Sequence, residues 1–150
     1  MKRITSPSDA QALVDQGALL SPWTEVGQKR IDEFATATGD RQWIHVDVER
    51  ASVESPFRGT VAHGFLTLSL LPYFLDSCIE FKQKMAVNYG LNRVRFITPV
   101  PSGSRVRGQI ALISAEEASG TWQLAWSIVV ELDGSVRPAC VAEMLTRHVF

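Results

Sequence analysis

One stretch decides the fold of this chain: VAHGFLTLSLLPYFL, residues 61–75. Its side chains are apolar nearly all round, so a helix over 61–78 must be enclosed by other elements. Pro72 predicts a kink in this helix or the end of its first section, because proline cannot donate the hydrogen bond of a helix interior. The stretch is shorter than the roughly 18–20 apolar residues of a membrane span. We therefore expect a buried helix at the centre of one domain.

Downstream of this helix the hydrophobic period changes to two, which is typical of strands. The alternating runs cover 85–98, 105–113, 121–132 and 136–149, and turn residues separate them. In the third run the alternate residues share one apolar face, as core residues do: Trp122, Leu124, Trp126, Ile128, Val130 and Leu132. Consecutive strands joined by short turns form an antiparallel sheet with one face to cover. The sequence therefore predicts an α+β fold in which a sheet wraps around the central helix.

Shorter elements are expected upstream, each with a start or stop signal. Ser6 or Ser8 can cap the first helix, and glycines are suited to helix ends. The elements are a helix over 6–16 ended by Gly17, an extended segment around Leu20–Val26, a helix over Gln28–Thr38 ended by Gly39, and a short helix near Asp47–Val53 capped by Asp47.

Composition narrows the class of protein. The 150 residues suit a single domain, 1–150, in which 1–19 forms a helical N-terminal extension. With 15 Lys and Arg against 16 Asp and Glu, the net charge of −1 excludes a generic nucleic-acid binder. Cys78 and Cys140 stand in apolar surroundings and indicate core thiols in a reducing compartment. The first residues lack the apolar core of a secretory signal, so we expect a cytoplasmic protein without a membrane span.

Reactive side chains are densest over residues 37–47, where Asp40 follows the helix-ending Gly39 and His45 lies five residues later in a loop. A carboxylate and an imidazole held by a tight loop can grip one water molecule, which suits general acid–base catalysis near neutral pH. The alternative is that Asp40 is only a turn residue and His45 a hydrogen-bonded loop histidine.

A metal site would have to use His45 and Asp47, with Asp40 as the third ligand. A catalytic zinc site typically has three protein ligands, often several histidines. The chain has three histidines, and His148 lies on a predicted strand near the C-terminus. We expect no metal.

A second candidate is His63-Gly64-Phe65 at the start of the central helix. The first amides of a helix are unpaired and its dipole is positive there, while glycine lets a ligand approach the backbone. Such a place suits a carbonyl oxygen that becomes negative during a reaction. The alternative is that Gly64 relieves crowding between helix and sheet.

Several polar residues admit two interpretations. Asn88 and Asn92 either mark a bend near Gly90 or contact a ligand. Arg93 and Arg95 share a strand face, which is more typical of solvated arginines than of a phosphate site, and Arg58 could bind phosphate from its loop.

Taken together, these segments resemble the MaoC-like dehydratases, which include the (R)-specific enoyl-CoA hydratases, and in particular their nodulation-protein-N-like single-domain branch. The resemblance covers about residues 20–149. It is carried by Phe34-Ala35-x-x-Thr38-Gly39-Asp40-x-x-x-Ile44-His45-x-Asp47, by VAHGFLTLSL at 61–70, by NYGLNRVRF at 88–96, by Pro99-Val100-Pro101 and by PACVAE at 138–143.

The resemblance implies a hotdog fold and a homodimer with an acyl-thioester tunnel near the interface. It implies reversible syn addition of water to a trans-2-enoyl thioester, on CoA or acyl carrier protein, giving an (R)-3-hydroxyacyl thioester without a cofactor. Asp40 and His45 become the catalytic pair, with His45 as the base. The Gly64 N–H becomes the oxyanion donor, with His63, Phe65, Asn88 and Arg93 as further substrate-binding candidates.

Two departures from the family pattern stand out. Gln42-Trp43 replaces the common Asn-Pro between the catalytic residues, and Pro72 stands where some relatives carry a serine. Two other functions remain open: a hotdog thioesterase, and a non-catalytic acyl-binding protein. The intact Asp40 and His45 pair favours the hydratase.

Overall fold

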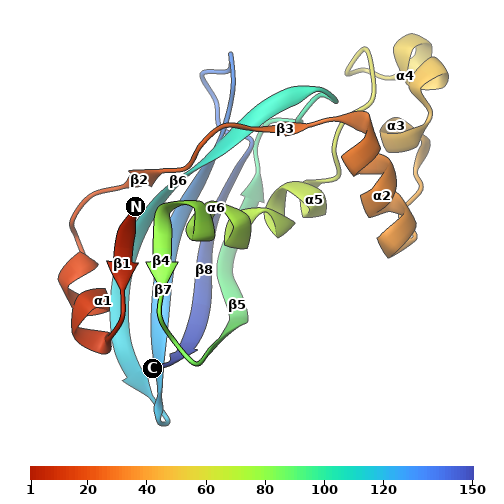
Figure 1. Cartoon of the computed structure of the whole chain (residues 1–150). Coiled ribbons are helices and arrows are strands. Elements are labelled where there is room, and N and C mark those ends of the chain that lie inside the picture. The colour runs from red at the N-terminus through yellow and green to blue at the C-terminus, as the bar shows by residue number, and fades with distance from the viewer.

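A sheet of long antiparallel strands forms the centre of the computed structural model, which describes residues 1–150 (Figure 1). The strand order is β2-β6-β7-β8-β5, and β3 also pairs with β6. These strands are β2 (Leu19–Leu20), β3 (Thr24–Val26), β5 (Met85–Phe96), β6 (Ser104–Ala118), β7 (Thr121–Leu132) and β8 (Cys140–Val149). The four predicted long strands are confirmed.

The boundaries of two strands differ from the prediction. β6 runs to Ala118, beyond the expected end at 113, because a bulge between Leu112 and Ser114 shifts its register without ending the pairing with β7. β8 begins at Cys140, and not at 136, because a turn at Gly134 and the fully exposed Val136 precede it.

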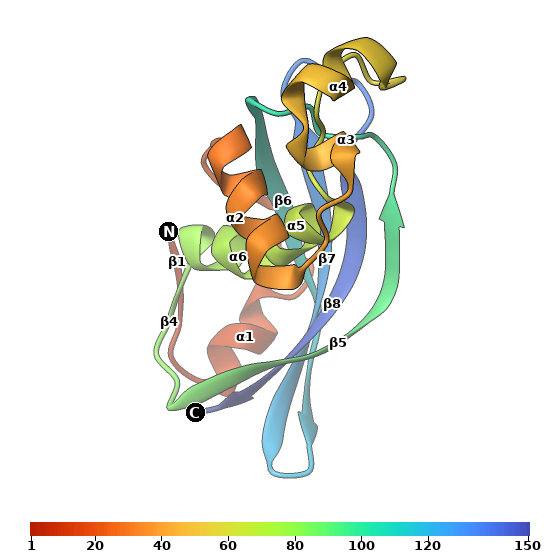
Figure 2. The same cartoon turned by 90° about the vertical axis from the view of Figure 1, so that its right-hand side faces the viewer.

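Two short helices, α5 (Gly64–Ser69) and α6 (Leu71–Cys78), lie across one face of the sheet (Figures 1 and 2). The prediction that the helix begins at residue 61 is therefore wrong, whereas the predicted end of a first section at Pro72 is confirmed by the break between α5 and α6. Residues 61–63 are extended, and the Ala62 N–H donates to the Val100 carbonyl at 2.8 Å. Pro72 lies in the first turn of α6, where it does not interrupt a helix interior.

The helix pair packs tightly on the sheet. Phe74 of α6 is completely buried. If Gly108 of β6 carried a Cβ atom, that atom would lie only 2.8 Å from the Cβ atom of Phe74. Glycine is therefore required where helix and strand approach. The predicted core face of β7 is confirmed, since Trp126 and its alternate neighbours are buried. Both cysteines are buried and free, as expected. None of the helices is long and apolar enough to cross a membrane.

The N-terminal residues contain a strand as well as the expected helix. β1 (Lys2–Ile4) pairs in parallel with β4 (Ile79–Phe81), which follows α6. The following helix, α1 (Pro7–Leu13), is capped by the Ser6 hydroxyl as predicted. It ends well before Gly17, because its last turn closes at Val14 and Asp15 adopts a left-handed conformation.

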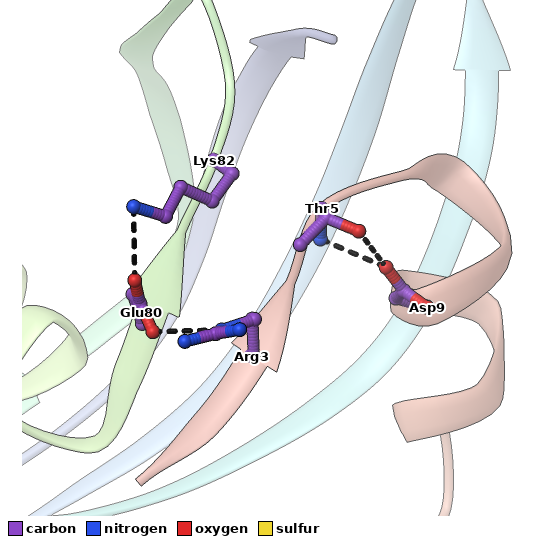
Figure 3. A network of polar contacts seen from close by, with 5 residues as sticks. All are labelled: Arg3, Thr5, Asp9, Glu80 and Lys82. Carbon is purple, nitrogen blue, oxygen red and sulfur yellow. Dashed lines mark hydrogen bonds and ion pairs between the residues drawn. The ribbon is translucent and has the colours of Figure 1, made fainter.

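Ion pairs and hydrogen bonds on the surface hold β1 and the start of α1 in position, as Figure 3 shows. Glu80 pairs with Arg3 at 2.8 Å and with Lys82 at 3.0 Å, and these contacts lower the pKa of Glu80. Asp9 accepts hydrogen bonds from the hydroxyl and amide of Thr5, which lower the pKa of Asp9. Exposed pairs of this kind add little stability, so they mainly set the position of β1.

Three helices gather beyond the α5 end of the helix pair: α2 (Gln28–Thr38), α3 (Trp43–Val46) and α4 (Val48–Glu54) (Figure 1). α2 has the predicted bounds, and Gly39 ends it with a φ of 80°. α4 matches the predicted short helix, since the Asp47 carboxylate accepts the Arg50 amide hydrogen. α3 was not predicted, because its single turn is too short to show a period.

Candidate active site

Asp40, His45 and His63 meet at the junction of three elements. Asp40 follows α2, His45 is part of α3 and His63 directly precedes α5. One ring nitrogen of each histidine and a carboxylate oxygen of Asp40 lie within 4.8 Å of one another. The expectation that His45 lies in a loop is wrong, because the chain after Gln42 closes one helical turn. The expected proximity of Asp40 and His45 is present.

The His45 ring is held in one tautomer by the backbone. Its Nδ1 lies 2.6 Å from the carbonyl oxygen of Val61, and a carbonyl can only accept. Nδ1 therefore carries the hydrogen, and in the neutral ring Nε2 keeps a free lone pair. The residue is only 8% exposed, so packing as well as hydrogen bonding fixes the ring. This is the form that can take a proton from a water molecule.

His63 connects the two members of this pair. Its Nε2–H donates to the backbone carbonyl of Asp40 at 2.9 Å, and its ring stacks on His45 with a centroid separation of 3.9 Å. The ring of Phe34 in α2 also contacts the His63 ring, with their centroids 5.0 Å apart. The Nδ1 atom of His63 is buried and has no hydrogen-bond partner. His63 thus touches the backbone that carries the carboxylate and the ring of the imidazole.

The three side chains have the donor atoms of a metal site, but the rings do not have its geometry. A metal ion lies in the plane of each imidazole that binds it, at about 2.0–2.1 Å for zinc. The rings of His45 and His63 are stacked with an angle of 24° between their planes. One ion therefore cannot lie in the plane of both rings and at bonding distance from a nitrogen of each. Asp47, the other ligand considered from sequence, caps α4.

Gln28 is a site residue that the sequence reasoning missed. Its side-chain amide donates to the His45 carbonyl at 2.7 Å and to Asp32 at 2.9 Å, and its oxygen accepts from the Thr60 hydroxyl at 2.6 Å. Gln28 thereby joins the start of α2 to α3 and to the segment before His63. In sequence it is an ordinary polar residue at a helix start, so no local signal reveals this contact.

The loop around Asp40 is organised by short-range bonds. The Gln42 amide hydrogen donates to the Asp40 carboxylate at 3.4 Å, while the Gln42 side chain makes no hydrogen bond. The guanidinium of Arg50 lies over the ring of Trp43, with the Arg50 Cζ atom 4.2 Å from the ring centroid. Trp43 thus connects α3 to α4.

Gly64 lines a cavity of about 300 Å³ between α5 and the end of β5. Thr67 and Thr98 also line it, and the Thr98 hydroxyl is buried without a partner. A Cβ at Gly64 would lie 3.1 Å from the ring of Phe96. The glycine therefore has the packing role considered from sequence, and it also borders an open space. Thr98 gave no sequence signal, because an unpaired hydroxyl is recognised only in three dimensions.

The other sequence candidates lie outside the histidine cluster. Phe65 is exposed and meets Phe96 edge to face. Asn88 lines two cavities on the α6 side of β5. Arg93 pairs in register with Glu143, whose neighbours in β8 are buried, so Arg93 faces the outer side of the sheet. The structure does not bring Arg93 to the histidines.

Known proteins resemble this chain over nearly its whole length. The model of the MaoC-like domain family matches residues 9–123. The 3-hydroxyacyl-thioester dehydratase Z of Mycobacterium tuberculosis H37Rv is 47% identical over 151 residues, which are 99% of both chains. Nodulation protein N of Rhizobium leguminosarum is 45% identical over 144 residues, covering 94% of this chain and 89% of that protein.

Solved structures confirm the hotdog fold. An (R)-hydratase of A. caviae aligns with a TM-score of 0.69 at 20% identity, covering 87% of this chain and 95% of that one. The R-hydratase PhaJ1 of Pseudomonas aeruginosa aligns with a TM-score of 0.71 at 17% identity, covering 93% of this chain and 84% of that one. At these identities the likeness establishes the fold and no further property.

Proposed function

The chain belongs to the MaoC-like domain family, and we propose that it adds water reversibly to trans-2-enoyl thioesters, giving (R)-3-hydroxyacyl thioesters. The family match and the 47%-identical dehydratase support an enzyme of the hydratase and dehydratase type. The observation that carries the proposal is the pairing of a tautomerically fixed His45 with the Asp40 carboxylate within 4.8 Å. Such a pair can hold and activate one water molecule.

The proposed reaction starts with a water molecule between Asp40 and His45. The free Nε2 of His45 takes a proton from the water, and the oxygen attacks the β-carbon of the enoyl group. Electrons move toward the thioester carbonyl, so the thioester supplies the electron sink and no cofactor is needed. A proton returned to the α-carbon by one member of the pair completes the addition. Delivery of both groups from one water position accounts for syn addition.

We place the thioester oxygen at the Gly64 amide. The first amide hydrogens of a helix have no partner within the helix, so they are available to an oxygen that becomes negative. The cavity of about 300 Å³ beside Gly64 offers room for the thioester group. The unpartnered Thr98 hydroxyl in the same cavity can contribute a second hydrogen bond. Phe96 lines the same cavity, and the Phe65 ring meets the Phe96 ring edge to face.

We propose further that the protein is a homodimer that pairs through β5. This strand is the last of the sheet, so one of its edges is free. Its apolar residues Met85, Val87, Tyr89, Leu91 and Phe96 are all exposed, as are Phe65 and Tyr73 on the neighbouring helices. An exposed apolar patch on a free edge is typical of an interface. Light scattering at micromolar concentration should give the mass of a dimer, and an active monomer would exclude the interface.

The activity is tested by mixing the purified protein with crotonyl-CoA. Loss of enoyl-thioester absorbance without release of free thiol supports the hydratase. Release of thiol indicates the thioesterase, and neither change together with ligand-induced thermal stabilisation indicates an acyl-binding protein. Chiral analysis of the product decides between the (R) and (S) alcohols. Repeating the assay with the acyl-carrier-protein thioester identifies the preferred carrier.

A further inference from the structure

Two adjoining cavities lie between the helix pair and strand β5. The first, of about 310 Å³, is lined by residues of α5, the start of α6 and the middle of β5. The second, of about 340 Å³, is lined by α6, the segment after β4, the start of β5 and the end of β8. Both include Pro72, Asn88 and Met144, so they adjoin, and together we call them the groove.

The groove leads away from the proposed thioester site. Its near end includes Leu68, four residues after Gly64, and its far end includes Asp76 of α6. With a rise of about 1.5 Å per residue, Pro72 and Asp76 lie about 12 and 18 Å from Gly64 along the helix pair. A chain that extends from a thioester at Gly64 and follows α5 and α6 would therefore reach the second cavity.

The lining changes character along the groove. The near cavity contains mainly apolar side chains, among them Leu68, Leu71 and Leu91. The far cavity contains five polar side chains, which we call the polar chamber: Asp76, Gln83, Asn88, Thr146 and His148. Asn88 is opposite Thr146 in the sheet and Ala86 is opposite His148, so these positions share the inner face. The small Ala86 side chain leaves this face open.

Some of these groups are already paired. The Nδ1–H of His148 donates to the Gln83 oxygen at 3.2 Å, and its Nε2 accepts from the Thr146 hydroxyl at 2.8 Å. That hydroxyl also accepts from the Trp126 ring nitrogen at 2.8 Å. Burial lowers the pKa of His148 to about 4, so the ring is neutral at pH 7.

Other groups of the chamber have no protein partner. The Asn88 side chain, which is exposed to solvent, makes no hydrogen bond within the chain, and the amide nitrogen of the half-buried Gln83 is unpaired because only its oxygen is engaged. The Asp76 carboxyl also lacks a partner, and burial raises its pKa. An apolar chain end placed here would desolvate these groups without replacing their hydrogen bonds to water, which is unfavourable.

We propose that the polar chamber receives a hydroxyl or carbonyl group on the acyl chain of the substrate, bound by Asn88 and Gln83. This inference rests on the proposed function and specifies its substrate class: thioesters whose acyl chain carries a hydrogen-bonding group beyond the enoyl end. One net hydrogen bond changes binding by about 2- to 12-fold. At the length that reaches the chamber, the hydroxylated substrate should therefore be favoured about 3- to 10-fold.

The test compares trans-2-enoyl-CoA substrates of equal chain length that end in a methyl or a hydroxyl group, over a series of lengths. We expect a lower KM for the hydroxylated member at the length that reaches the chamber, and no effect of the chamber on crotonyl-CoA. Asn88→Leu should abolish the preference between the two chain ends. Asn92→Leu is the matched control on the same strand, because the Asn92 side chain is bonded to Glu143.

The inference is overturned if the methyl-ended substrate is bound equally well or better at every length, or if the preference survives in Asn88→Leu. Isothermal titration with the corresponding saturated acyl-CoA pairs measures the same preference without turnover. A failure to hydrate crotonyl-CoA therefore counts against the proposed function alone, while the titration still decides whether the chamber selects polar chain ends.

Discussion

The chain buries histidines near both ends of its central helix pair, and it holds them in different ways. At the α5 end, a backbone carbonyl fixes one nitrogen of His45 and one of His63, and the other nitrogen of each has no partner in the chain. At the far end, side chains engage both nitrogens of His148. A base needs a free lone pair in a fixed direction, whereas a structural imidazole needs all its bonds satisfied. The comparison therefore supports the proposed role of His45 as the base and is consistent with a structural role for His148.

The largest expected effect is at Asp40 and His45. Asp40→Asn removes the carboxylate at constant size, and His45→Ala removes the base. Each should lower kcat for crotonyl-CoA hydration by about 10²–10⁴-fold, the scale of acid–base groups. The double variant should be little worse than the poorer single one, because both groups act on one water molecule. His148→Phe is the control at the other end and should leave kcat unchanged. A folded Asp40 or His45 variant with normal turnover would refute the assignment.

Gly64 should show the next largest effect. Gly64→Val places a branched side chain between the amide and the thioester oxygen, and loss of an oxyanion donor costs about 10²–10³-fold in kcat. The added Cβ would also push against the Phe96 ring at 3.1 Å. Phe96→Leu alone is therefore the control for displaced packing, and thermal melting checks that Gly64→Val remains folded. If Phe96→Leu loses as much activity as Gly64→Val, the displaced packing alone explains the loss, and the oxyanion role of Gly64 is contradicted.

The elements that sequence predicts best are those whose signals are local. α2 ends where Gly39 requires it, and the long strands follow their period of two. Pro72 anticipates the break between α5 and α6, whereas the single turn of α3 is too short for a period to reveal. β1 depends on pairing with residues 77 positions away, as between Lys2 and Ile79. A strand of three residues has no signal that anticipates such a partner.

The candidate site shows the same difference between local sequence signals and contacts that form only in three dimensions. Asp40, His45 and Gly64 are found from spacing and resemblance, because they lie in two short motifs. Gln28 and Thr98 are not found, because what distinguishes them is a contact or an empty neighbourhood in three dimensions. His63 is found as part of a motif, but its bond to the Asp40 carbonyl joins residues 23 positions apart. Sequence therefore suggests the reacting groups more readily than the groups that position them.

A smaller effect is expected at His63, which we infer positions both members of the pair. His63→Phe keeps an aromatic ring against His45 but removes the hydrogen bond to the Asp40 carbonyl. A small displacement of the carboxylate can cost about 10²-fold, so kcat should fall by up to that factor while KM changes little. His63→Gln, which retains a donor, should recover part of the loss. A pH profile of kcat separates this role from simple destabilisation, and a normal kcat at every pH in His63→Phe would contradict it.

The smallest effect concerns His148 and is seen in stability. Burial lowers the pKa of His148 from 6.5 to about 4, so between these values the unfolded chain binds a proton that the folded chain does not. Its contribution to the free energy of unfolding is therefore complete above pH 6.5 and decreases as the pH falls toward 4. Between pH 7 and pH 5 the loss should be about 1–2 kcal/mol, allowing for solvent in the adjoining chamber.

Urea unfolding of the wild type and His148→Phe at both pH values measures this loss. The phenylalanine keeps the ring stack with Phe81 and Phe150 but cannot bind a proton. The wild type should therefore lose about 1–2 kcal/mol more than the variant on acidification. The Asp76 carboxyl, whose pKa burial raises, acts in the opposite direction, because its protonated form is favoured in the folded chain. Since Asp76 is present in both proteins, its effect cancels in the difference. An equal loss in the two proteins would mean that the His148 ring is solvated, and the contrast between the two ends of the helix pair would no longer hold.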